Sequence, residues 1–158
     1  MSKIAPCLWF DTEAEEAAKF YVSIFPNSKI SKTARYPEGL PGDRAGQVLT
    51  VEFELDGVTF TGLNGGPQFK FDEAISFQIY VDDQAELDRY WNALLADGGV
   101  ESQCGSLKDR FGLSWQVAPT QLGKLMASPD REAANRVAAA MMQMVKLDIA
   151  KLEAAAAG

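Results

Sequence analysis

Histidine is absent from the 158 residues of this sequence. Its absence removes the commonest general base of enzymes, the usual imidazole ligand of metal sites, and serine or cysteine triads of the ordinary kind. Cysteine is scarce too, because only Cys7 and Cys104 are present and they lie far apart in the chain. Such a pair indicates neither a zinc site nor a disulfide framework, and is typical of buried, reduced thiols.

The sequence also has few basic residues and no long apolar segment. The 15 basic residues are outnumbered by 22 acidic ones, which gives a net charge of −7. We therefore predict no nucleic-acid partner and no binding to anionic membranes. No apolar run approaches the roughly 20 residues of a membrane-spanning helix. The N-terminal residues lack the features of a secretory signal, so a cytoplasmic location is expected.

The composition that is present is that of a globular protein. Hydrophobic residues make up 47% of the chain and charged residues 23%, which are ordinary values for a folded domain. A chain of this length forms one domain with a real core, or two half-domains that share one.

The first half of the chain reads as β-α-β-β-β. A β-rich segment to Asp11 is followed by Thr12 with Glu15 three residues later, a pattern that predicts a capping box and a helix ending near Phe25. A candidate strand and a Pro/Gly-rich loop come next. Two alternating segments then flank the pair Asp56–Gly57, which predicts a β-hairpin.

The second half repeats this pattern after a shift of 71 residues, which aligns the helix start at Thr12 with Asp83. Asp83 is followed by Glu86 in capping position, and the predicted helix ends at Gly98–Gly99. Short strands with a turn near Asp109–Gly112 complete the repeat. We interpret the chain as an internal duplication of a βαβββ unit.

An alanine-rich segment follows Pro119. Ser128 in N-cap position, with Pro129 at the first helical position, predicts one helix of five or more turns with Val137 and Met141 on its apolar stripe. The final residues, EAAAAG, are expected to fray. The predicted division is a first module at 1–66, a second at 67–120 and a helical extension at 121–158, together one compact domain.

Several segments together cover nearly the whole chain and resemble a known family: LWFD, EEAAKFY, FPNSKI, LTVEFELDG, GLNGGP, SFQIYVDD, LLADGG, DRFGLSWQVAP and AMMQMVKLDIAKLE. The sequence is similar to the vicinal oxygen chelate superfamily (the glyoxalase and bleomycin-resistance fold), and within it to the PhnB-like branch, often labelled 3-demethylubiquinone-9 3-methyltransferase. The resemblance implies an α+β fold in which two tandem βαβββ modules form a cupped half-barrel, followed by a C-terminal helix. It also implies a homodimer, in which the apolar helix needs a surface to cover it.

In a cup of this kind, strand alternation places some side chains on the helix side and others in the cavity. The expected ligand-binding residues, which offer amide, hydroxyl, thiol and aromatic groups, are Cys7, Trp9, Thr61, Asn64, Ser76, Gln78, Tyr80 and Gln116. The alternative is that these amides satisfy one another in a wet cup without a ligand.

Glu52 is the candidate catalytic base, because desolvation in a cavity would raise the pKa of its carboxyl group. The alternative interpretation is an exposed strand residue paired with Lys or Arg. Both interpretations follow from the same placement of Glu52 on the cavity side of its strand.

Metal-dependent members of the superfamily bind a divalent ion through His and Glu. The resemblance maps those positions to Ala5 or Pro6, Thr61 or Leu63, Ser76 and Gln116, which are neutral and unsuited to Zn, Ni or Fe. We therefore predict no metal ligands and no cofactor. A site improvised from Cys7, Glu52 and Gln116 is the alternative.

The leading hypothesis is a metal-independent protein that binds a small molecule, or an enzyme of unassigned reaction, on a vicinal oxygen chelate scaffold. One alternative is a metal-dependent lyase or dioxygenase with atypical ligands. Another is the 3-demethylubiquinone-9 3-methyltransferase of the family label. Against it, the segment GLNGGP follows a strand but precedes a linker, whereas the common adenosylmethionine site has a glycine-rich loop between a strand and a helix.

Overall fold

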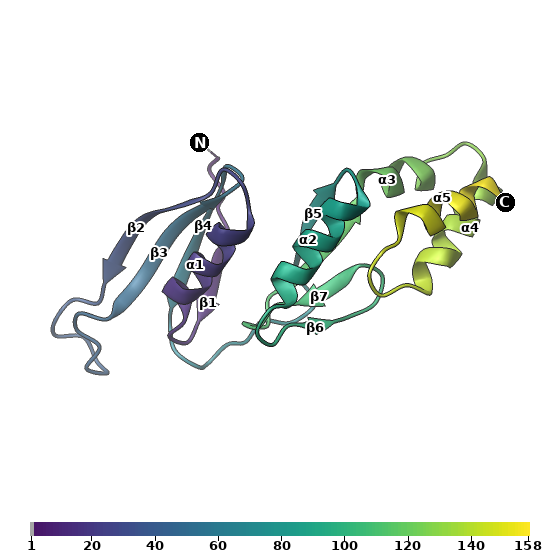
Figure 1. Ribbon diagram of the computed structural model, residues 1–158. Helices are drawn as coiled ribbons and strands as arrows, with labels where there is room; N and C mark the ends of the chain where they lie inside the picture. Colours follow the sequence, from purple (N-terminus) through teal and green to yellow (C-terminus); the bar gives the residue numbers. More distant parts are fainter. Residues whose placement is uncertain (1) are drawn as a thin grey trace. The chain divides into compact units, whose positions relative to one another are not determined.

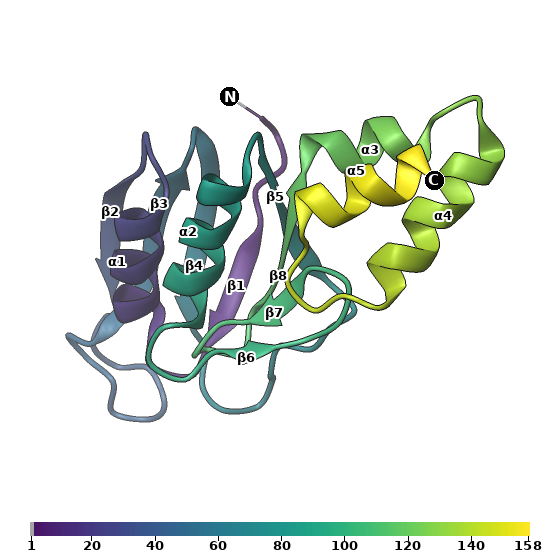
Figure 2. The ribbon, with the colours of Figure 1, turned by 45° about the vertical axis from the view of Figure 1, so that its right-hand side comes forward.

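The computed structural model describes residues 2–158 of the chain. The chain divides into two compact units, Met1–Phe71 and Asp72–Gly158. Figures 1 and 2 show that each unit contains a sheet with a helix against one of its faces, and that the second unit ends in further helices. This is the α+β fold with two tandem βαβββ modules that the sequence predicts.

The first unit has an open four-stranded sheet with the order β1-β4-β3-β2. Its first strand runs parallel to β4, and the other pairs are antiparallel. The elements are β1 (Cys7–Phe10), α1 (Ala14–Ile24), β2 (Lys29–Arg35), β3 (Val48–Leu55) and β4 (Val58–Asn64).

The core of the first unit lies between α1 and one face of the sheet. Tyr21 of α1 stacks on Phe53 of β3 with ring centroids 6.2 Å apart, and Phe53 stacks on Phe60 of β4 at 5.4 Å. The alternation of β3 places Val51 and Phe53 in this core, where both are fully buried, as predicted from the period of 2.

The hairpin between β3 and β4 turns at Asp56–Gly57. The two residues have φ angles of 47° and 81°, and a type I′ turn needs positive φ at both of its central positions. The predicted hairpin is therefore confirmed, and its turn has the backbone conformation of this type.

The start of α1 differs from the prediction. The N-cap residue is Glu13 and not Thr12, and no side chain of the helix start caps it. The Ala14 N–H donates instead to the Oδ1 atom of Asn64, at 2.9 Å, from the end of β4. The predicted Thr12–Glu15 capping box is wrong, because a side chain 50 residues away occupies the position of the cap.

The second unit repeats the topology, with an open sheet of order β5-β8-β7-β6 in which β5 and β8 are parallel. The predicted internal duplication is confirmed by this identical strand order. The elements are β5 (Ser76–Val81), α2 (Gln84–Leu95), β6 (Val100–Glu101), β7 (Ser106–Lys108) and β8 (Ser114–Pro119).

The helix α2 begins as predicted. Asp83 is its N-cap residue, and the carboxylate accepts a hydrogen bond from the Glu86 N–H at 2.8 Å. The Glu86 side chain reaches back to the Asp82 N–H at 2.9 Å. Two of the free N–H groups at the helix start are thus satisfied by local side chains.

A buried carboxylate organises the turn between β7 and β8. Asp109, which is 3% exposed, accepts hydrogen bonds from the N–H groups of Phe111 and Leu113 at 2.9 and 3.1 Å. Its second oxygen accepts from the Trp115 Nε1–H at 2.9 Å. The turn predicted at Asp109–Gly112 is present, and it is built on this side chain.

The C-terminal extension consists of three helices, so the prediction of one long helix is wrong. They are α3 (Thr120–Met126), α4 (Arg131–Met142) and α5 (Ile149–Ala157). Helix α4 is capped by Asp130, which accepts from the Ala133 N–H at 3.1 Å, and not by Ser128. A second cap at Asp148 begins α5.

Helix α4 ends at Met142, and the main chain that follows it binds the turn before β7. The N–H groups of Cys104 and Gly105 donate to the carbonyl oxygens of Met144 and Val145, at 2.9 and 2.7 Å. These carbonyl groups lie outside both helices. Leu147 follows them and is 1% exposed, which anchors the loop in the second core.

The final segment is helical to Ala157, and the predicted fraying is wrong. Arg136 of α4 donates to the carbonyl oxygens of Ala155 and Ala156, each at 2.8 Å. Five apolar side chains of α4 and α5 are buried inside the second unit and need no partner to cover them: Ala133, Ala134, Val137, Ile149 and Leu152.

Within residues 2–158, every helix is too short or too polar to traverse a lipid bilayer.

Candidate functional site

The first unit presents one sheet face that α1 does not cover. Cys7 of β1 lies beside Thr61 of β4, and Thr61 lies beside Glu52 of β3, so three predicted residues form one row across the sheet. Lys32 of β2 continues this row beyond Glu52. The row combines a thiol, a hydroxyl and a pair of opposite charges.

The candidate base Glu52 is exposed on this face of the first unit. Its neighbours in register are Thr61 on one side and the exposed Lys32 on the other. The first unit therefore leaves the Glu52 carboxylate in contact with solvent. Lys32, its neighbour in register, carries the opposite charge.

Cys7 is exposed as well, so the prediction of a buried thiol at this position is wrong. Desolvation by the surrounding atoms nevertheless raises the pKa of its thiol above the ordinary value. A raised pKa keeps the thiol protonated at neutral pH, and the thiolate is the nucleophilic form of cysteine. The raised pKa therefore favours the thiol form of Cys7 over the thiolate.

Trp9 stands on the same face and is held by the segment after β4. Its Nε1–H donates to the Gly66 carbonyl at 2.9 Å, and the Phe69 ring meets it edge-on with centroids 4.9 Å apart. A Cβ atom on Gly65 would lie 2.3 Å from the indole ring. The chain passes this close to Trp9 because Gly65 has no side chain.

Asn64 was expected to line a ligand cavity at the end of its strand, but its side chain is buried. It is 5% exposed, its Oδ1 caps Ala14, and its Nδ2–H donates to the Val48 carbonyl at 3.1 Å. Both ends of the amide are therefore engaged in holding the first unit together.

The second unit brings four predicted residues into one chain of hydrogen bonds. The Tyr80 hydroxyl donates to Gln78 Oε1 at 2.8 Å, and Gln78 Nε2 donates to Gln116 Oε1 at 3.2 Å. Gln116 Nε2 then donates to Ser76 Oγ at 2.9 Å. The pairing of β5 with β8 sets Gln78 directly beside Gln116. The amides thus satisfy one another, as in the alternative to a cup that binds a ligand.

The amide chain opens into a cavity of about 360 Å³ within the second unit, here called the amide pocket. Among the described residues, those that line it include no Asp, Glu, Lys or Arg. Its polar side is formed by Gln78, Gln116, Tyr80 and Ser106, and its apolar side includes Leu122 of α3 and Met141 of α4. Cavities of this size bind small molecules in many proteins.

Part of the lining of the amide pocket escapes prediction. The C-terminal extension supplies Leu122, Gly123, Met141 and Leu147, and the turn before β7 supplies Cys104. The sequence signal for the extension is its Met-rich segment 141–144, since methionine is common on adaptable binding surfaces. That signal does not show which sheet the segment contacts.

The residues at the superfamily's metal positions do not fit a divalent ion. Ser76 and Gln116 are neutral, and they already bind each other at 2.9 Å. Residues 2–158 bring together no group of three His, Cys, Asp or Glu side chains that could hold a metal. Zinc and iron sites need imidazole, thiolate or carboxylate ligands.

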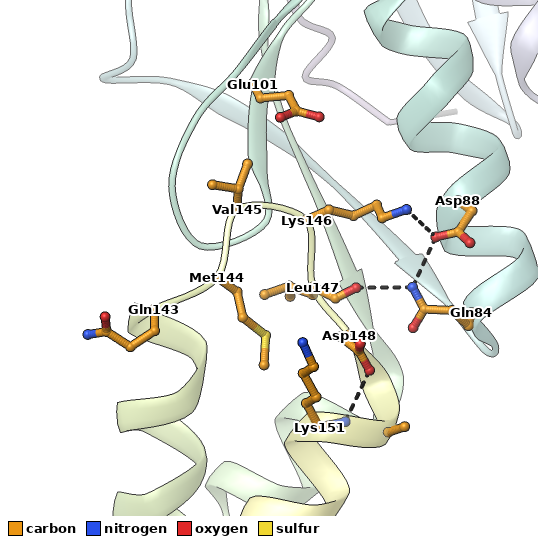
Figure 3. Close-up of a pocket in the computed structure, with 11 residues that line it drawn as sticks. Gln84, Asp88, Glu101, Gln143, Met144, Val145, Lys146, Leu147, Asp148 and Lys151 are labelled. Carbon is orange, nitrogen blue, oxygen red and sulfur yellow. Dashed lines mark hydrogen bonds and ion pairs between the residues drawn. The ribbon is translucent and has the colours of Figure 1, made fainter.

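A second cavity, of about 610 Å³, lies between α2 and the loop that joins α4 to α5 (Figure 3). Gln84 crosses this boundary: its Nε2 donates to the Leu147 carbonyl at 3.1 Å, and its Oε1 accepts from the Ile149 N–H at 2.9 Å. Lys146 forms an ion pair with Asp88 at 3.0 Å. These contacts attach the extension to α2.

The pKa of Asp88 is lowered, first by the hydrogen bond from the Gln84 side chain and then by Lys146. Figure 3 shows both bonds converging on the same carboxylate. The cavity is lined by both acidic and basic side chains, in contrast to the uncharged amide pocket.

Comparison with solved structures defines the class of this fold. A PhnB protein from Bacillus cereus that carries a 3-demethylubiquinone-9 3-methyltransferase label is 30% identical, with a TM-score of 0.67, and the match covers 75% of this chain and 100% of that chain. A Pseudomonas aeruginosa protein is 22% identical with a TM-score of 0.62, over 75% and 98% of the two chains.

The fosfomycin resistance protein FosX from Mesorhizobium loti shares the fold at 11% identity and a TM-score of 0.50, over 74% and 91% of the two chains. The architecture is thus that of the vicinal oxygen chelate (glyoxalase/bleomycin-resistance) superfamily.

Within that superfamily, the family model described as 3-demethylubiquinone-9 3-methyltransferase matches residues 2–118. The protein belongs to this PhnB-like family. A search of curated proteins gives no match. The matched region ends at the second sheet, so the helices α3 to α5 lie beyond it, and with them Leu122 of α3 and Met141 of α4, which line the amide pocket.

Proposed function

We propose that the protein binds an uncharged, partly flat small molecule in the amide pocket, without a metal ion. The observation that carries this proposal is the hydrogen-bonded chain from Tyr80 to Ser76, which opens into a cavity lined by no charged residue. An enzymatic reaction on this ligand is compatible with the scaffold and is not part of the proposal.

The lack of charge in the lining selects for a neutral ligand. A charged group that enters a cavity without a counter-charge loses its hydration and gains no partner. Tyr80 offers an aromatic face, while Leu122 and Met141 offer apolar contacts. The ligand is expected to be apolar over most of its surface and polar along one edge.

The amide groups favour a ligand edge that accepts hydrogen bonds. Gln116 and Gln78 each use one N–H of the Nε2 group within the chain, and a primary amide has two. The second N–H of each side chain is available for a ligand carbonyl. Neutral quinones and related cyclic ketones have this combination of a flat apolar ring and carbonyl acceptors.

The predicted residues of the first unit form a second part of this proposal. Cys7, Trp9 and Thr61 lie on one uncovered sheet face, and we propose that this face is a ligand-binding surface of the first unit in its own right. Glu52 as a catalytic base stays a prediction, and it requires an environment that desolvates the carboxylate.

The quinone methyltransferase named in the family description is the second candidate. The description supports a quinone as ligand. The β-α connections, at Asp11–Glu13 and Asp82–Asp83, contain no glycine, whereas the common adenosylmethionine site has a glycine-rich loop there. Saturable binding of adenosylmethionine in calorimetry would establish this second function.

A cytoplasmic homodimer completes the proposal. Ile75, Tyr80 and Val100 of the second unit are 70%, 64% and 62% exposed, and we propose that a second copy of the chain covers part of this apolar surface. Light scattering on the purified protein would show a mass twice that of the chain.

The ligand test uses a thermal-shift screen of neutral quinones, each beside a carboxylated analogue of the same ring. Neutral compounds are expected to stabilise the protein, and their charged analogues are not. Gln116→Ala should abolish the shift in melting temperature, because it removes the amide that links Gln78 to Ser76 in the hydrogen-bonded chain. Gln68→Ala, at an exposed glutamine of the first unit, is the control and should leave the shift unchanged.

Stabilisation by charged analogues, or a shift that survives Gln116→Ala, would contradict the proposed pocket. Metal analysis of the dialysed protein provides the second readout. A stoichiometric divalent metal that persists after dialysis would favour a metal-dependent lyase or dioxygenase instead.

A further inference from the structure

The lining of the amide pocket contains two glycines, Gly105 and Gly123. The fold itself requires the first of them. Gly105 has a φ angle of 79°, and a Cβ atom there would lie 2.9 Å from the Leu147 Cγ atom. A residue with a side chain adopts this conformation rarely, and Leu147 leaves no room for one.

Gly123 meets neither of these requirements. It lies in the interior of α3, its φ angle is not positive, and a Cβ atom on it would have no other atom within 4 Å. The 13 glycines of the chain all lie within residues 2–158. Each of the others has a positive φ angle or an atom within 4 Å of the added Cβ atom. Gly123 is therefore the exception among them.

A glycine at this position weakens α3. Glycine is less favourable than alanine in a helix interior, because it loses more conformational freedom on folding. Helix α3 has only 7 residues, and none of its side chains is fully buried, so packing gives it little additional support. The stability of the protein alone would thus favour alanine at residue 123.

The location of Gly123 indicates what its missing side chain admits. Gly123 is exposed and lines the amide pocket beside Leu122. Its carbonyl oxygen accepts a hydrogen bond from the Ala127 N–H at 3.1 Å. The surface that Gly123 offers to the pocket is therefore mainly its Cα atom and the plane of its peptide group, which suit a flat apolar ring.

We propose that the flat ring of the ligand lies against Gly123, and that the missing side chain makes the room for this ring. The inference rests on the proposed function and adds the part of the pocket that the ring contacts. The carbonyl edge of the ligand then meets the amides of Gln78 and Gln116, and the apolar part of the ring meets α3 at Leu122 and Gly123. A methyl group at residue 123 would take space that the ring needs.

The test measures the affinity of each variant for duroquinone (tetramethyl-1,4-benzoquinone) by equilibrium dialysis. Duroquinone is neutral and flat, and its methyl groups occupy every free ring position, so that it does not add to the thiols of Cys7 and Cys104. Gly123→Ala should weaken binding about tenfold, because the added methyl group overlaps the ring. Gly123→Leu should weaken binding further.

The melting temperature without ligand separates this effect from damage to the fold. Gly123→Ala should melt about 2 to 4 °C above the wild type, since alanine favours the helix and its methyl group has no neighbour within 4 Å. Greater stability together with weaker binding is the result expected of a residue constrained by the ligand.

Lys124→Ala is the matched control. Lys124 follows Gly123 in α3, is exposed and does not line the amide pocket. This variant should bind duroquinone as the wild type does.

Unchanged affinity in Gly123→Ala would overturn the role of Gly123 and leave the proposed function standing. A lower melting temperature of Gly123→Ala without ligand would overturn it as well, because the methyl group would then meet the protein. Equal losses of affinity in Gly123→Ala and Lys124→Ala would have the same consequence. A wild type that binds no duroquinone, or Gln116→Ala with wild-type affinity, would instead contradict the proposed function, on which this inference rests.

Discussion

The two units share one topology and stabilise it with different side chains. In the first unit, α1 begins beneath Asn64, which reaches it from the end of β4. In the second unit, α2 begins with its own Asp83. The strand position that pairs Phe10 with Asn64 pairs Val81 with Pro119, and proline has no side-chain acceptor. Both helices therefore have a side-chain acceptor at their first turn, but the acceptor comes from a different position in each unit.

The hairpin turns show the same contrast. The first unit turns on the backbone conformation of Asp56–Gly57, whereas the second turns around the buried carboxylate of Asp109. A backbone turn depends on φ angles, and a carboxylate turn depends on hydrogen bonds to a desolvated charge. The turn at Asp109 is therefore more sensitive to a single substitution, because one side chain accepts hydrogen bonds from three donors.

The largest expected effect is therefore at Asp109. Asp109→Ala leaves the Trp115 indole and two backbone N–H groups without their acceptor, and should lower the free energy of unfolding by about 3 kcal/mol. Asp56→Ala at the corresponding turn should cost about 1 kcal/mol, since only a left-handed φ is strained. Urea unfolding of both variants measures the difference, and equal losses would show that the two turns are equivalent.

The second prediction compares the helix caps. Asn64→Ala removes the cap of Ala14 and also the bond to the Val48 carbonyl in a buried position, which should cost about 2 kcal/mol. Asp83→Ala removes one exposed cap and should cost about 1 kcal/mol. A larger loss in the Asp83 variant would contradict the role given to Asn64. Both values come from the same unfolding measurement.

The smallest effect concerns the attachment of the extension, which only the second unit has. Gln84→Ala removes the two bonds to the loop before α5 and should increase hydrogen exchange at Ile149 by about fivefold, equivalent to about 1 kcal/mol of local stability. Exchange at Ala14, in the first unit, is the control and should not change.

The same attachment is sensitive to acid. The pKa of Asp88 is below its ordinary value of 3.8 in the folded protein. Its contribution is complete above that value and is lost as the pH falls through the folded pKa. The opening equilibrium at Ile149, taken as the exchange rate divided by the intrinsic rate at the same pH, should therefore rise below about pH 4 in the wild type. In Asp88→Asn this rise should be smaller, and an equal rise would exclude Asp88 as its cause.

Features with a local cause could be predicted from the sequence. Strand alternation placed Val51 and Phe53 in the core and Gln78 and Tyr80 on the opposite face, because the period of 2 is a property of every strand. The cap at Asp83 is local in the same sense, since its donor lies three residues away.

Features that depend on distant partners could not be predicted. The main chain after Met142 binds Cys104 and Gly105, and α4 alone gives no indication of it. The cap of α1 is supplied across 50 residues of sequence. The amide chain was predictable in its members, whereas Leu122 and Met141 could join the pocket only once the extension folded back.

The placement of the three tryptophans gives each unit its own optical signal. Trp9 is held against the Gly66 carbonyl in the first unit, while Trp91 and Trp115 donate to Glu101 and Asp109 in the second. Replacing both second-unit indoles by Phe leaves fluorescence that reports the first unit alone, and Trp9→Phe leaves the complementary signal. The order in which the duplicated halves melt can thus be recorded in a single chain, with no added label.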